Sequence, residues 1–304
     1  MKRDVRAESL LVLTTLIWGG TFAVIKGALS DISPMLMIGL RFTLAAALSW
    51  PLLMRGSPKN IFTPAAWLWG AAIGFAMLVG YAGQTIGLKY TSVARSGFIT
   101  YSFALFVPFL QFFILGKKPD RGNMLGLVVV FLGLSFITDA LSGGFKNGGI
   151  NKGDLYSFLG ALGYAFYIVL LDRASKVSHP AALTVIQMLF CGVFALGLVP
   201  LVEEPVLILT WSLAAAMFYL VIFGSVLALA LMNWFQRRLT PLRAVLIYAL
   251  EPVFAALIGW MAFNAGMSSR EMIGASLILG GIVVSDIWVL LTGAWRRRRE
   301  GCKI

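Results

Sequence analysis

The chain has 304 residues, of which 59% are aliphatic or aromatic and 12% are charged. Too few polar side chains are available to cover a water-soluble domain, so most side chains must face lipid or one another. In a soluble chain the formal net charge of +12 would suggest nucleic-acid binding. Here the cations lie in short loops between apolar segments, where membrane insertion retains Lys and Arg on the cytoplasmic side, and no nucleic-acid partner is expected.

Ten apolar segments follow one another along the chain. Each is close to the roughly 20 residues that a helix needs to cross the hydrocarbon layer. Pro34, Pro180 and Pro241 fall in the first turn of their segments, where a missing amide donor costs nothing. The sequence therefore predicts an all-α membrane protein with ten transmembrane helices at 8–26, 34–54, 65–88, 91–116, 121–139, 154–173, 180–201, 211–236, 240–263 and 271–293.

Lys and Arg are distributed unevenly between the predicted loops. If the amino terminus is cytoplasmic, eighteen of the 25 basic residues lie in cytoplasmic segments, six lie outside and Arg41 lies within a span. This asymmetry predicts that both termini are cytoplasmic and that the chain lies in the plasma membrane, the inner membrane of a bacterium. A basic cytoplasmic tail is predicted at 296–304, where a run of arginines also suits contact with anionic membrane lipids.

The two halves of the sequence resemble each other. An offset of 146 residues superposes Glu8 on Asp154, Trp18 on Tyr164, Pro34 on Pro180 and Arg41 on Gln187. From the fourth span onward an offset of 148 superposes Lys89 on Arg237, Gly126 on Gly274 and Gly133 on Gly281.

Each half contains five spans, and because five is odd the second half must enter the membrane from the opposite side. This predicts two inverted five-helix repeats, an arrangement in which outward-open and inward-open packings have similar energies. Gene duplication without transport is the alternative explanation. We place the first repeat at 1–139, a linker rich in Gly, Asn and Ser at 140–153, and the second repeat at 154–295.

Four motifs resemble those of a known family: WGGTF at 18–22, LRFTLAA at 40–46, LEPVFAALIGW at 250–260 and IGASLILGGI at 273–282. Over nearly the whole chain the sequence is similar to the ten-helix EamA-type branch of the drug/metabolite transporter superfamily. The resemblance implies an exporter of small metabolites or drugs, and export of aromatic amino acids is among the family's known activities. The chain departs from the family at Lys117 and Ala265, near which other members often carry an acidic residue.

Five side chains are predicted near the middle of the membrane, because counting ~1.5 Å per residue from each helix start places them there. They are Trp18, Tyr101, Tyr164, Tyr248 and Glu251. Trp and Tyr normally favour the membrane interfaces, and at the midplane their polar atoms need partners or a wet cavity. The group predicts an aromatic-lined pocket for a flat or apolar small-molecule substrate, and aromatic packing between helices is the alternative.

Two charged residues within spans are further candidates for the substrate site. Glu251 must be neutral, paired or in contact with water, so it predicts proton coupling or binding of a substrate amine. The alternative is a hydrogen bond that locks the helix beside Pro252. Arg41 either extends to the outer interface or faces the cavity and attracts an anionic group.

Several enzyme classes lack their motifs in this sequence. No GxxxxGK[ST] loop and no metal-ligand spacing occur, so neither ATP hydrolysis nor a metal or other cofactor is expected. His179 is the only histidine and no nucleophile elbow is present, which argues against an enzyme acting on lipid-linked substrates. We expect a secondary transporter that exports amino acids, aromatic ones above all, or planar drugs by alternating access, with a channel or facilitator as the alternative.

Overall fold

Helices account for most of the chain in the computed structural model, which describes residues 4–55, 57–58, 60–138, 150–263 and 268–301. The first half contains α1 (Val5–Gly19), α2 (Thr21–Ala28), α3 (Pro34–Met54), α4 (Pro64–Tyr90), α5 (Val93–Tyr101), α6 (Phe103–Leu115) and α7 (Arg121–Ile137). The second half contains α8 (Lys152–Ala174), α9 (Pro180–Val202), α10 (Trp211–Phe218), η2 (Tyr219–Leu227), α11 (Ala228–Phe235), η3 (Gln236–Arg238), α12 (Pro241–Tyr248), α13 (Glu251–Phe263) and α14 (Ser269–Gly301).

These elements join into ten spans that coincide with the predicted ones. In the described part of the chain, eight helical segments are long and apolar enough to cross a membrane, and α7 is a shorter apolar helix. The tenth predicted span lies within α14. The chain is therefore a multi-pass, all-α membrane protein, as the sequence predicted.

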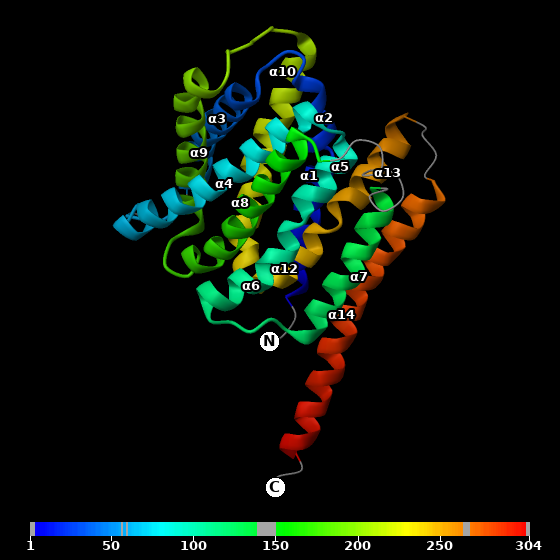
Figure 1. Ribbon diagram of the computed structural model, residues 1–304. Coiled ribbons are helices and arrows are strands. Elements are labelled where there is room, and N and C mark those ends of the chain that lie inside the picture. The colour runs from blue at the N-terminus through cyan, green and yellow to red at the C-terminus, as the bar shows by residue number, and fades with distance from the viewer. Residues whose placement is uncertain (1–3, 56, 59, 139–149, 264–267, 302–304) are drawn as a thin grey trace.

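α1 begins and α14 ends at the same end of the bundle, as an even number of spans requires (Figure 1). α14 continues to Gly301 through the segment predicted as a tail and projects beyond the other helices (Figure 1). The linker predicted at 140–153 lies for the most part outside the described residues, since the description resumes at residue 150.

Three spans are interrupted near their middle. The first breaks at Gly20, beside a second glycine with low helix propensity, and the hydroxyl of Thr21 donates to the carbonyl of Trp18 at 2.8 Å. The fourth breaks at Ser102 and the ninth at 249–250. At the ninth, Pro252 is the second residue of α13, so it offers no amide to the carbonyl one turn earlier.

The contact between α7 and α14 has the symmetry of a twofold axis in the membrane plane. A Cβ atom on Gly126 would lie 2.6 Å from the carbonyl oxygen of Gly281, and one on Gly133 would lie 2.6 Å from that of Gly274. Gly126 is equivalent to Gly274 and Gly133 to Gly281 by the offset of 148, so the axis exchanges the two contacts. Close backbone approach of this kind requires glycine.

Two buried ion pairs repeat the same symmetry at opposite ends of the bundle. Arg243 of α12 donates to Glu8 of α1 at 3.0 Å, and Arg95 of α5 forms two hydrogen bonds to Asp154 of α8. Glu8 and Asp154 are equivalent by the offset of 146, and the two arginines by that of 148. The architecture is therefore a pair of inverted five-helix repeats.

Candidate functional site

A cavity of about 310 Å³ lies at the centre of the bundle, between helices of both repeats. Five of the six predicted site residues line it: Trp18, Tyr101, Tyr164, Tyr248 and Glu251. The structure thus brings together residues from the first, fourth, sixth and ninth spans. The cavity wall also includes side chains that the sequence analysis did not single out: Tyr81, Gln84, Thr100, Phe103 and Tyr167.

The aromatic rings of the wall contact one another. The ring centroids of Trp18 and Tyr248 are 5.6 Å apart, and those of Tyr101 and Phe103 are 4.8 Å apart. Tyr164 lies against Phe103 at 6.2 Å and, edge to face, against Tyr81 at 5.3 Å. Rings in such contact form a continuous apolar surface that suits a flat ligand.

The polar atoms of these rings form hydrogen bonds with other groups of the protein. The hydroxyl of Tyr101 donates to the carbonyl of Val245, that of Tyr164 to Gln84 at 2.7 Å, and that of Tyr248 to Gln236 at 2.9 Å. The indole nitrogen of Trp18 donates to the carbonyl of Gly224 at 3.1 Å. These bonds hold the rings in place, so the rings offer a ligand their faces and edges rather than their donors.

Glu251 is the first residue of α13 and lines the cavity. None of the residues that the structure describes donates a hydrogen bond to the Glu251 carboxylate or forms an ion pair with it. The helix-locking hydrogen bond considered for this residue therefore has no partner in the described chain. The Thr100 hydroxyl, also on the cavity wall and 4% exposed, likewise has no hydrogen-bond partner in the part of the chain that the structure describes.

Arg41 lies behind the cavity wall, not on it. Its side chain is buried, with Nε donating to the Ser225 hydroxyl at 2.8 Å and Nη2 to the Gly224 carbonyl at 3.1 Å. The guanidinium carbon lies 4.8 Å from the ring centroid of Phe42 and 4.9 Å from that of Tyr81. Arg41 thereby fixes the π-helical turn η2 and supports the Tyr81 ring, which separates it from the cavity.

The cavity extends toward the end of the bundle opposite to the start of α1. Its lining there comes from Val93 and Ala94 at the start of α5, Thr138 after α7 and Glu271 at the start of α14. Figure 1 shows these helix ends together, away from the start of α1 and the end of α14.

Hydrogen bonds join the helices at the other end of the bundle. The amide of Leu242 donates to Gln111 at 3.3 Å, and Ser285 donates to Asn123 at 2.5 Å. Arg243 approaches Ser285 at 3.5 Å while it pairs with Glu8. In the described chain, these contacts close the bundle below the cavity.

Equivalent residues of the two repeats face each other across the cavity. Twelve of the lining residues form six equivalent pairs, three at the offset of 146 and three at that of 148, which we extend to Gln84 because it lies on α4 with Lys89. The cavity thus lies on the pseudo-twofold axis. The pairs are Trp18 with Tyr164, Thr21 with Tyr167, Phe22 with Ile168, Gln84 with Met232, Thr100 with Tyr248 and Phe103 with Glu251.

The repeat itself was the signal that could have identified the additional lining residues. The sequence analysis selected Glu251 and Tyr248. Their equivalents in the first repeat are Phe103 and Thr100. Tyr167 follows Tyr164 by nearly one helical turn and is therefore on the same face. Tyr81 has no such signal, because its place depends on how α4 is rotated against its neighbours.

The fold and the cavity define a class: membrane transporters built from inverted repeats around a central site. The sequence matches the EamA-like transporter family twice, over residues 5–139 and 151–285. The protein belongs to this family of transporters.

Relatives from several organisms are similar along most of their length. An uncharacterized transporter of Archaeoglobus fulgidus is 28% identical, covering 93% of this chain and 86% of the relative. The inner membrane transporter YedA of Escherichia coli is 26% identical over 88% of this chain and 87% of its own. A solved crystal structure at 22% identity superposes with a TM-score of 0.78 over 94% of this chain and 98% of that chain, which supports the fold.

Proposed function

We propose that this transporter is a secondary carrier that exports small organic molecules by alternating access, with the central cavity as its substrate site. The observation that carries the proposal is the position of the cavity on the pseudo-twofold axis, lined by six equivalent pairs. A site on the axis belongs equally to both repeats. It therefore keeps its place when the two repeats exchange conformations.

Symmetry identifies the residues that such an exchange would expose. Ala94 and Gly97 line the cavity in the first repeat, and their equivalents Leu242 and Val245 are fully buried at the closed end. When the repeats exchange conformations, Leu242 and Val245 become exposed to the cavity, and Ala94 and Gly97 become buried. The cavity then faces the opposite side of the membrane without moving.

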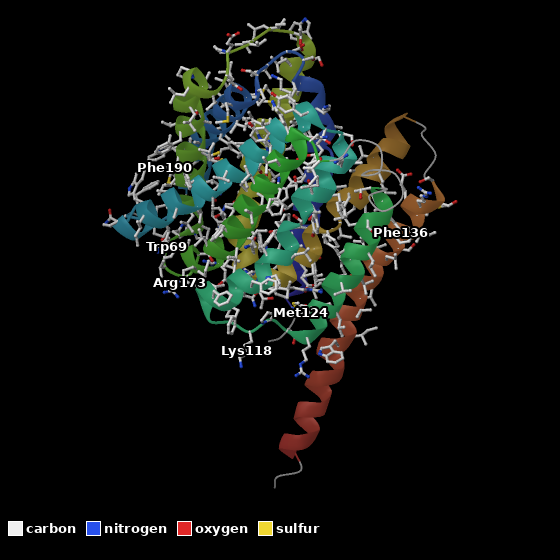
Figure 2. The ribbon with its side chains drawn as sticks, viewed as in Figure 1. Trp69, Lys118, Met124, Phe136, Arg173 and Phe190 are labelled. Atoms are coloured by element: carbon white, nitrogen blue, oxygen red, sulfur yellow. The ribbon has the colours of Figure 1, made fainter. Side chains whose placement is uncertain are left out.

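The basic residues support a cytoplasmic location for the end where α1 begins. Figure 2 shows Lys118 and Arg173 at that end, in agreement with the positive-inside distribution. Both termini are then cytoplasmic, in a plasma or bacterial inner membrane, and the cavity opens outward. The inner-membrane name of YedA is consistent with this location.

The cavity favours flat, largely apolar substrates of modest size. Its 310 Å³ lies near the lower end of the roughly 300–1,000 Å³ typical of small-molecule pockets. Aromatic amino acids and small planar drugs fit this shape. The Glu251 carboxylate has no partner among the described residues and is available for proton coupling or for a substrate amine.

Transport by purified protein in proteoliposomes tests the proposal. A carrier gives uptake that saturates with substrate concentration and accelerates when unlabelled substrate is present inside, whereas a channel gives neither. Ala256→Trp, which fills the cavity, should abolish this uptake, while Ala214→Trp on an exposed surface of α10 should preserve it. Uptake that neither saturates nor exchanges would contradict the proposal.

A further inference from the structure

The charge of the cavity wall is opposite to that of the whole chain. The formal net charge of the protein is +12, yet the charged residues on the described cavity wall are two glutamates, Glu251 and Glu271, with no Lys, Arg or His among them. A wall with carboxylates and without cations attracts positively charged ligands and repels anions.

The two glutamates differ in what they can offer a ligand. Glu271 at the cavity mouth already accepts hydrogen bonds from the amide and hydroxyl of Ser268, at 2.7 and 2.9 Å, and so caps α14. Glu251 has no such partner among the described residues and lies at the helix break beside the aromatic cluster. Glu251 is therefore the carboxylate that a ligand would satisfy.

We propose that the cavity selects flat organic cations, such as aromatic rings that carry one protonated amine, and that Glu251 is their counter-ion. This inference rests on the proposed transport function and names the charge class of its substrate. The ammonium group donates charge-assisted hydrogen bonds to Glu251. The faces of Trp18 and the neighbouring tyrosines attract the same positive charge.

An aromatic amino acid should bind in this cavity less tightly than the corresponding amine. Its carboxylate needs a cationic partner, and no described lining residue supplies one. Arg41 is the charged group behind the wall, but its guanidinium is engaged by Ser225 and Gly224 and is separated from the cavity by the Tyr81 ring. Binding a zwitterion therefore leaves a carboxylate unpaired, which costs affinity.

Four indoles that share one ring and differ in charge provide the test. Tryptamine is a cation, tryptophan a zwitterion, indole neutral and indole-3-acetate an anion at neutral pH. Their affinities for the purified full-length protein are measured by titration calorimetry, and their transport is measured by uptake into proteoliposomes. We expect tryptamine to bind at least about tenfold more tightly than tryptophan, and indole-3-acetate to bind most weakly.

The variant Glu251→Gln keeps the size of the side chain and removes its charge. It should weaken tryptamine binding by about tenfold or more and leave neutral indole unchanged. The matched control, Glu204→Gln, makes the same chemical change at an exposed loop position and should alter neither affinity. If Glu251→Gln does not fold, the ranking of the four probes on the native protein still decides the matter.

Different results contradict the charge inference and the transport function. Tryptophan or indole-3-acetate binding as tightly as tryptamine, or an unchanged tryptamine affinity in Glu251→Gln, would overturn the cation assignment even if uptake saturates. Absence of saturable uptake for all four indoles, although tryptamine binds through Glu251, would count against transport and leave the cation site standing.

Discussion

The helix breaks of the fourth and ninth spans occupy equivalent positions in the two repeats but differ in chemistry. α6 begins at Phe103 after the break at Ser102, and α13 begins at the equivalent Glu251. The same backbone interruption thus presents an aromatic ring from one repeat and a carboxylate from the other to one cavity. The shape of the site follows from what the repeats share, and its charge follows from where they differ.

Some contacts between the repeats likewise have an equivalent under the twofold symmetry, and others do not. The ion pairs Glu8 with Arg243 and Arg95 with Asp154 are equivalent, and both are formed in one conformation. If the repeats exchange conformations, each pair takes the state of the other and remains formed. These pairs therefore stabilise both conformations, whereas the bond from Tyr101 to Val245 has no counterpart, because Ala249 replaces the tyrosine in the second repeat.

The largest expected effect is on stability and should be equal in the two repeats. Arg95→Ala and Arg243→Ala each remove the arginine from a buried carboxylate, so each should lower the free energy of unfolding by about 3–5 kcal/mol. Chemical unfolding in detergent micelles measures this. Arg238→Ala, which removes a solvent-exposed pair with Asp4, is the control and should change little. A large loss at one arginine and none at the other would break the equivalence.

The glycine contacts between α7 and α14 should respond symmetrically to a single added methyl group. Gly126→Ala and Gly274→Ala each bring a Cβ atom to 2.6 Å from a facing carbonyl oxygen. Each should cost about 1–3 kcal/mol, measured by the same unfolding experiment. Gly280→Ala is the matched control, because its Cβ would meet nothing within 4 Å. Because alanine has the higher helix propensity, Gly280→Ala should not destabilise the protein, and a loss as large as in the other two variants would contradict the contact explanation.

Substitution of Phe103 sharpens the distinction between shape and charge. Phe103→Leu removes a ring that contacts Tyr101 and Tyr164. It should weaken binding of all four indoles by a similar factor of about two to ten, because the lost ring contact is indifferent to ligand charge. Phe113→Leu, at a position 77% exposed on α6, should leave binding intact. A loss confined to tryptamine would show that Phe103 contributes to charge recognition.

The smallest expected effect is on the pH dependence of stability and concerns His179. This residue precedes α9, as the equivalent Ser33 precedes α3. Nδ1 of His179 accepts a hydrogen bond from the amide of Ala181 at 3.3 Å, so the ring must be unprotonated at that nitrogen. Burial, followed by the charge of Arg237, lowers the pKa of His179 below its usual value. The folded protein thus releases the proton more readily than the unfolded chain does.

The stability contributed by His179 is consequently complete above the unfolded-state pKa and is lost as the pH falls through the lower folded-state pKa. Thermal unfolding between about pH 7.5 and about pH 5 measures it. His179→Asn keeps a capping acceptor that does not titrate, so its melting temperature should depend less on pH than that of the native protein. An equal pH dependence in both proteins would show that the cap does not contribute.

The fold was predictable from the sequence because lipid imposes a strong constraint. The lengths of the apolar segments, the prolines in the first turn of three of them and the placement of basic residues determine the spans. The two offsets determine the inverted repeat. The aromatic residues of the first, fourth, sixth and ninth spans could be grouped because the repeat relates those helices. Glu251 stood out as a carboxylate at midspan.

Other features depend on the rotation of helices and on local backbone geometry, which hydropathy does not encode. Arg41 could have faced lipid, water or protein, and its place was settled by Ser225 and the Gly224 carbonyl of a π-helical turn. The contribution of Tyr81 to the cavity depends on that same arginine. The direction in which the cavity extends depends on packing at Leu242 and Asn123, and no motif marks those residues.

Side-specific labelling of Ala94→Cys and Leu242→Cys, in a Cys302→Ser background, tests most directly whether the cavity faces the two sides in turn. Ala94 and Leu242 are equivalent, one exposed at the cavity mouth and the other buried at the closed end. With a membrane-impermeant maleimide, each cysteine should react from its own side of the membrane. Adding Tyr101→Phe should raise the rate at position 242 while lowering it at position 94. Reaction of both cysteines from the same side, or rates that rise together, would contradict alternating access.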